Sequence, residues 1–122
     1  MTGDELRVVR VFLLVEIALF ALAALLHKGL FLPRYAHDKA AIAESVIMLV
    51  LSAGLAFGVS RRSAARTAAL YAQVFAFLGV CVGVVMIFSG IGPRSVLDYC
   101  IHAVMLATLA FGIATARRIR LI

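Results

Sequence analysis

The sequence predicts an all-α fold: a four-helix transmembrane bundle with up-down-up-down topology and both termini in the cytoplasm. Of the 122 residues, 65% are hydrophobic and the mean hydropathy is +1.11, whereas soluble domains contain roughly 45–50% apolar residues. Four apolar stretches each approach the ~20 residues that cross a bilayer. We place these spans at residues 8–30, 40–59, 67–89 and 96–116. Little chain is left over, so residues 1–122 form a single integral membrane domain.

The distribution of basic residues predicts the orientation. The net charge is +6, and the arginines before the first span, between the second and third, and after the fourth all fall on one side. Since basic residues favour the cytoplasmic side of a membrane, we expect a multi-pass protein of the plasma (inner) membrane. Anchoring in the lipid bilayer explains these arginines, so nucleic acid is not expected as a partner.

The connections between the spans are short and differ in chemistry. The first, about residues 27–39, is the longest and most polar, and Pro33 favours a non-helical turn there. The second is rich in arginine. The third, residues 90–95, is a glycine-proline turn that ends at Ser95, a residue suited to cap the last helix. Such short connections make consecutive helices antiparallel neighbours.

Small residues suggest where helices approach one another. Gly54 and Gly58 form one GxxxG pair, and Gly79 and Gly83 form another. In lipid this spacing allows close packing of helix backbones. The pairs predict either packing inside one bundle or a seam between copies, which leaves a homo-oligomer or a larger membrane complex as possible assemblies.

A short internal repeat accompanies the second and fourth spans. The sequence Leu-Ala-Phe-Gly occurs at residues 55–58 and again at 109–112, and at the same offset Glu44 aligns with Asp98. Both spans run in the same direction, so a duplication would be parallel, as in some transporters. If the repeat is real, Glu44 and Asp98 are symmetry mates across a central site.

Ionisable residues at or inside the membrane boundaries are the strongest functional signal. An ionisable side chain inside a membrane is costly and is by default a functional-site hypothesis. The spacing of these residues predicts that Glu44, Asp98 and His102 lie in one site, with a histidine approaching from the first span. The set consists of Glu16, His27, His37, Glu44, Asp98 and His102.

Two chemistries compete for the five residues nearest the long first loop. The first is a metal site of His27, His37, Glu44, Asp98 and His102, whose nitrogen and oxygen donors favour Zn, Fe or Mn as a cofactor. The second is a proton relay or cation-transport site, since chains of Asp, Glu and His mark such pathways. A haem held by His27 and His102 is a further alternative. Hydrogen bonds that only join helices would explain the residues without a ligand.

Glu16 is expected to act separately from these residues. It lies toward the cytoplasmic side of the first span, and Gln73 is at comparable depth in the third span. We therefore predict a Glu16–Gln73 hydrogen bond, and the pair is the candidate proton relay or substrate group in the inner half of the membrane.

The resulting hypothesis is a small polytopic membrane protein with an outward-facing His/carboxylate site. This site binds a metal ion, or relays or transports a proton or cation. The alternatives are an accessory or structural subunit of a membrane complex and a haem-binding membrane protein. Catalysis is left open: a membrane metalloenzyme is compatible with the sequence, but no spacing places a serine or cysteine nucleophile beside a histidine.

Overall fold

The fold is a bundle of four long helices. The computed structural model describes residues 1–92 and 94–119, and all regular structure among them is helical. Each α-helix belongs to a segment that is long and apolar enough to cross a membrane, as the sequence predicted. The elements are α1 (Gly3–His27), η1 (Pro33–Tyr35), α2 (Asp38–Ser60), η2 (Arg62–Ala64), α3 (Ala65–Phe88) and α4 (Val96–Arg118).

The first helix begins at Gly3 and so extends beyond the start of the predicted membrane span, residues 8–30. The cause is a capping box: the Thr2 hydroxyl accepts from the Glu5 amide at 3.2 Å, and the Thr2 amide donates to the Glu5 carboxylate at 2.7 Å. Such reciprocal bonds satisfy amides that a helix start leaves free. The helix ends at His27 and not at Leu30, because Gly29 turns the chain with a φ of +78°.

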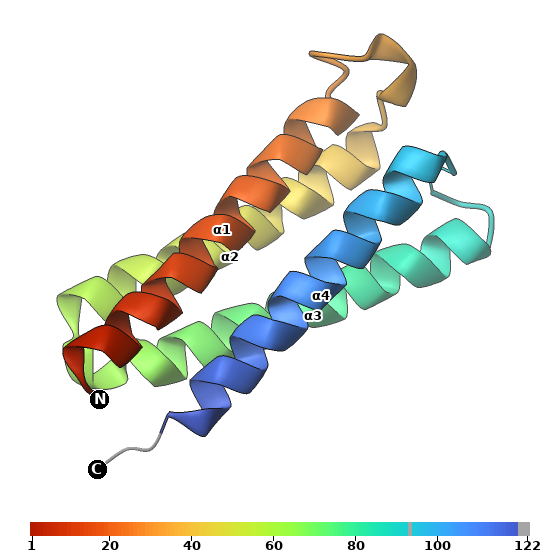
Figure 1. Ribbon diagram of the computed structural model, residues 1–122. Helices are drawn as coiled ribbons and strands as arrows, with labels where there is room; N and C mark the ends of the chain where they lie inside the picture. Colours follow the sequence, from red (N-terminus) through yellow and green to blue (C-terminus); the bar gives the residue numbers. More distant parts are fainter. Residues whose placement is uncertain (93, 120–122) are drawn as a thin grey trace.

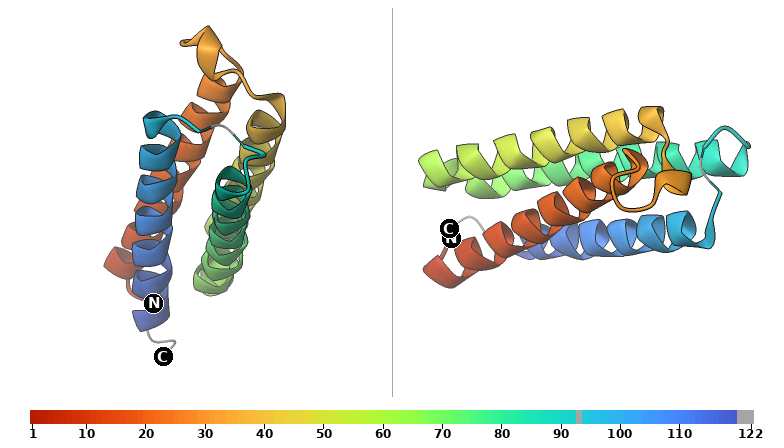
Figure 2. Two further views of the ribbon diagram at one scale, coloured as in Figure 1. Left: turned by 90° about the vertical axis from the view of Figure 1, so that its right-hand side faces the viewer. Right: turned by 90° about the horizontal axis from the view of Figure 1, so that it is seen from above.

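The helices form two layers, α1 beside α4 and α2 beside α3 (Figures 1 and 2). The N-terminus, the C-terminal end of α4 and the α2–α3 connection lie at one end of the bundle, which we call the terminal end (Figure 1). The α1–α2 and α3–α4 connections lie at the other end, which we call the loop end. The two polar connections are thereby neighbours.

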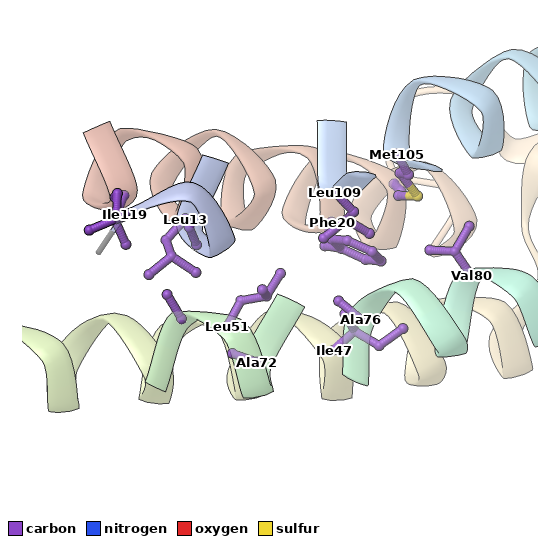
Figure 3. Packing of buried hydrophobic residues seen from close by; sticks show 14 residues of the cluster. Leu13, Phe20, Ile47, Leu51, Ala72, Ala76, Val80, Met105, Leu109 and Ile119 are labelled. Carbon is purple, nitrogen blue, oxygen red and sulfur yellow. The ribbon is translucent and has the colours of Figure 1, made fainter. Parts of the chain in front are cut away.

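The core lies between the two layers and consists of apolar side chains (Figure 3). Leu13, Phe20 and Leu109 face Ile47 and Leu51 across it, and all five are buried. Many other large apolar side chains remain exposed on the outside of every helix. A bundle that is apolar both inside and outside fits lipid as its surroundings.

Glycines bring α2 and α3 together inside the bundle. A Cβ added to Gly54 would lie 2.8 Å from the Ala72 Cβ, and one added to Gly58 would lie 3.1 Å from the Ala65 Cα. Gly79 likewise accommodates Ile47, which would be 2.7 Å from an added Cβ. These glycines of the two GxxxG pairs are thus used in packing within the chain.

Candidate functional site

The site is centred on His27, the last residue of α1. Its side chain is buried, with 1% of the residue exposed, in spite of its position beside the polar first loop. The backbone fixes this position, because the His27 carbonyl accepts from the His37 amide at 2.7 Å and so closes the loop.

Both ring nitrogens of His27 face carboxylates from other helices. Nδ1 lies 2.9 and 2.8 Å from the two carboxylate oxygens of Glu44 in α2. Nε2 lies 2.9 Å from Oδ1 of Asp98 in α4. We call His27, Glu44 and Asp98 the triad. It joins three helices through one imidazole ring.

Besides contacting His27, Asp98 helps to cap the start of α4, and this second role explains its position. Its Oδ2 accepts from the Ser95 amide at 2.9 Å and from the Ser95 hydroxyl, while the Asp98 amide donates to Ser95 Oγ at 3.2 Å. This capping box confirms the predicted cap at Ser95. It also holds the Asp98 carboxyl group at the helix start, with Oδ1 directed to His27. Ser95, which the sequence indicated only as a helix cap, is therefore also a hydrogen-bond partner of a triad residue.

The two contacts of His27 limit the charge that the triad can carry. If both contacts are hydrogen bonds, the three groups hold two protons. An imidazolium between two carboxylates carries a net charge of −1, and so does a neutral imidazole between one carboxylic acid and one carboxylate. Removing either proton leaves two acceptors facing each other, which breaks one of the contacts with His27.

Two of the histidines predicted for this site contact backbone groups and not the triad carboxylates. His37 caps α2, and its Nδ1 accepts from the Ala40 amide at 3.2 Å. His102 Nδ1 donates to the Asp98 carbonyl at 2.7 Å, and its Nε2 would lie 3.2 Å from a Cβ added to Gly83 in α3. The structure therefore brings together His27, Glu44 and Asp98, but the His102 side chain bonds neither carboxylate.

A second buried polar group lies toward the terminal end. The Gln73 amide nitrogen donates to both carboxylate oxygens of Glu16, at 2.9 and 3.1 Å, as predicted. Gly112 makes room for the pair, since an added Cβ would lie 2.4 Å from Gln73 Nε2 and 2.5 Å from Glu16 Oε1. We call Glu16 and Gln73 the inner pair. Among residues 1–92 and 94–119, the buried polar side chains all belong to the inner pair or the triad.

Apolar side chains separate the two polar groups. Glu16 and His27 are eleven residues apart on α1, about 16 Å along the helix axis. Phe20 and Ala23 lie between them on the buried face of α1, each 1% exposed. The polar face of α1 is therefore interrupted, and the triad and the inner pair are two separate sites.

A cavity of about 510 Å³ opens at the loop end beside the triad. It lies between the first and third loops and is lined by Arg34, Tyr35, His37, Arg94, Ser95 and Asp98. Asp98 thus belongs both to the triad and to the wall of an open polar cavity. In the sequence, Arg34 and Arg94 contribute to the net charge, but their spacing does not indicate that the two loops bring them to one cavity.

The triad fits a metal or a haem poorly in this arrangement. Both His27 nitrogens are occupied by carboxylates, so neither is free as a haem ligand. Within the described part of the chain, no group of three or more His, Cys, Asp or Glu side chains is arranged to hold a metal ion. The donors face one another and not a shared centre.

Comparisons with known proteins do not identify the chain: no family model, curated protein or solved structure matches it.

Proposed function

We propose that this protein is a small proton-linked transporter of the plasma (inner) membrane in which the triad binds and exchanges protons. The observation that carries the proposal is the position of Asp98. This residue lines the open cavity and contacts His27, whose other nitrogen contacts Glu44. Two hydrogen bonds therefore connect the cavity to a buried carboxylate, and chains of Asp, Glu and His mark proton pathways in membranes.

Loss of a proton would act on helix packing. With one proton fewer, either the His27–Glu44 or the His27–Asp98 contact loses its hydrogen and becomes repulsive. Because these contacts join α1 to α2 and α1 to α4, protonation would bias the positions of three helices. A ligand that binds one arrangement better than another shifts the equilibrium between them, and a proton would be such a ligand.

The second candidate is a structural subunit, in which the contacts of His27 with Glu44 and Asp98 only hold the helices together. It is favoured by the inner pair, which joins α1 to α3 and is enclosed within the bundle. The two functions differ in one measurable property. A transporter takes up protons at the triad while it stays folded, whereas a structural contact keeps one protonation state.

Infrared difference spectroscopy tests this property directly. Spectra of the detergent-purified protein at acidic and neutral pH are compared for the wild type and a Glu44→Gln/Asp98→Asn variant. We expect a carboxyl signal in the wild type that the variant lacks. The matched control is Asp4→Asn/Asp38→Asn, which removes two exposed carboxylates and should leave the triad signal in place.

Circular dichroism establishes that each variant remains helical. If the folded triad variant gives the same carboxyl signal as the wild type, and the His27 ring signals also stay constant with pH, the triad takes up no proton and the structural function stands instead. If only the triad variant loses signal, the proposal is supported.

The orientation proposed here places both termini in the cytoplasm and the loop end outside. A single cysteine at position 34, made by Arg34→Cys with Cys81 and Cys100 replaced by alanine, tests it. We expect a membrane-impermeant maleimide added to intact cells to label this cysteine. Labelling only after the membrane is opened would reverse the orientation.

A further inference from the structure

We infer that the cavity at the loop end binds an anionic group, a carboxylate or a phosphate, between Arg34 and Arg94. The inference rests on the proposed function in one respect: if the protein is a transporter, its substrate carries such an anionic group. The binding site itself depends only on the residues that line the cavity.

Two guanidinium groups line the cavity from different loops, and each has a support. The Arg34 guanidinium carbon lies 5.2 Å from the centre of the Tyr35 ring. The Arg94 guanidinium lies over Gly90, where an added Cβ would be 2.1 Å from its Nη2. Gly90 also has a φ of +83°, a conformation that favours glycine. Both arginines are thus positioned by their own loops.

Both arginines of the cavity are exposed, and the negative charge nearest to them in the wall belongs to the triad. Neither guanidinium forms an ion pair among residues 1–92 and 94–119. Asp98 is the carboxylate in the cavity wall, but its Oδ1 faces His27 and its Oδ2 accepts from Ser95. Two arginines without a carboxylate partner leave room for an anion, which guanidinium groups bind through paired hydrogen bonds.

His37 adds a neutral donor to the same wall. Its Nδ1 accepts from the Ala40 amide, so the proton of the neutral ring is on Nε2. The N-terminal ends of α2 and α4 also meet this cavity, because their capping residues His37 and Ser95 both line it. Helix N-termini carry partial positive charge. Two arginines against the single net negative charge of the triad thus disfavour a metal or organic cation and favour an anion.

The anion can come from two sources with the same chemistry, a lipid headgroup or a solute. The size of the cavity, about 510 Å³, is within the range of small-molecule sites, roughly 300–1,000 Å³. Its place at the predicted membrane surface also allows a lipid phosphate to enter. The experiment must therefore establish binding first and the source second.

Amide chemical shifts of the isotope-labelled full chain in a phosphate-free maltoside detergent provide the test. Inorganic phosphate is the probe, and we expect saturable shifts at Tyr35, His37 and Ser95. Arg34→Gln and Arg94→Gln should each weaken the apparent affinity about tenfold, since a charged hydrogen-bonding partner is lost.

The matched control is Arg61→Gln/Arg62→Gln, which removes two exposed arginines at the terminal end and should leave the affinity unchanged. Absence of a saturable shift in the wild type overturns the inference, as does equal weakening by the control. This result is independent of the triad, because the infrared signal of Glu44 and Asp98 is measured without phosphate.

Nanodiscs then distinguish the sources. Discs of phosphatidylcholine alone are compared with discs that also contain phosphatidylglycerol. If the phosphate-induced shifts are lost in either kind of disc, a lipid headgroup occupies the arginine site. If the shifts persist in both discs, the site is selective for a soluble anion. Both outcomes support the anionic chemistry, and both depend on the saturable binding established in detergent.

Discussion

The triad and the inner pair are both buried and polar, yet they differ in three respects that bear on function. The triad consists of three ionisable side chains from three helices, whereas the inner pair has one ionisable side chain and joins two helices. Asp98 of the triad lines an open cavity. Glu16 is fully buried and lies against the space that Gly112 leaves free.

Under the proposed function, only the first of these two buried acidic sites exchanges protons. What distinguishes the triad is that several ionisable groups contact one another and that one of them, Asp98, lines an open cavity. The hydrogen bond of the inner pair is of the kind that holds two helices, here α1 and α3, in position. Four substitutions, taken from the largest expected effect to the smallest, test the comparison.

Asp98→Ala should have the largest effect. It removes a partner of buried His27 and the capping interactions with Ser95, and breaking one side of a buried charge pair costs about 3–5 kcal/mol. Unfolding by SDS, followed by circular dichroism in mixed micelles, measures the loss. Asp4→Ala, at an exposed position in the first turn of α1, is the control. Equal stability of the two variants would show that the contacts of Asp98 do not stabilise the fold.

Gly112→Ala should destabilise the protein although alanine is the better helix former. The added Cβ would lie 2.4 Å from Gln73 Nε2 and 2.5 Å from Glu16 Oε1, and overpacking of this kind costs about 1–3 kcal/mol. The same unfolding assay applies, with Gly3→Ala as the control, because a Cβ added there would lie 3.9 Å from its nearest neighbour, Arg62 Nη2. A stabilised Gly112→Ala variant would contradict the close packing of the inner pair.

Gln73→Leu should cost about 1–3 kcal/mol, since it leaves buried Glu16 without its hydrogen-bond donor. Adding Glu16→Leu should recover most of this loss, because replacing both partners by apolar groups is often nearly neutral. A double-mutant cycle in the unfolding assay measures the coupling. Additive losses in the double variant would show that the two residues do not act as a pair.

Glu16→Gln should have the smallest effect on the triad. The two groups are about 16 Å apart, with Phe20 and Ala23 between them, so the infrared signal of the triad should be unchanged. In vesicles loaded with a pH-sensitive dye, the same variant should reduce proton flux across the membrane if Glu16 takes part in transport. A change in the triad signal would show that the two sites are coupled after all.

The sequence predicted the four spans because twenty-residue apolar runs have few alternatives in a membrane. It also predicted the Ser95 cap and the Glu16–Gln73 bond, which depend on helix starts and on depth. It missed the start of α1 at Gly3, because a capping box between Thr2 and Glu5 extends the helix beyond the apolar run.

Spacing was less informative about the site. The four-residue separation of Asp98 and His102 places them on one face, and they do interact, but through the Asp98 carbonyl. The direction of the His102 ring depends on its close approach to Gly83 in α3, which is a tertiary contact. The convergence of Arg34 and Arg94 on one cavity depends in the same way on how two loops fold.

The most direct test of the central claim is the protonation of His27 itself, followed by ¹⁵N NMR of its ring nitrogens across the pH range in which the protein remains folded. His27→Gln assigns the signals. We expect both ring nitrogens to change in one step that the Glu44→Gln/Asp98→Asn variant alters or removes. Ring signals that stay constant over the whole range, together with no infrared carboxyl signal from Glu44 or Asp98, would contradict proton exchange at the triad and leave it as a structural contact.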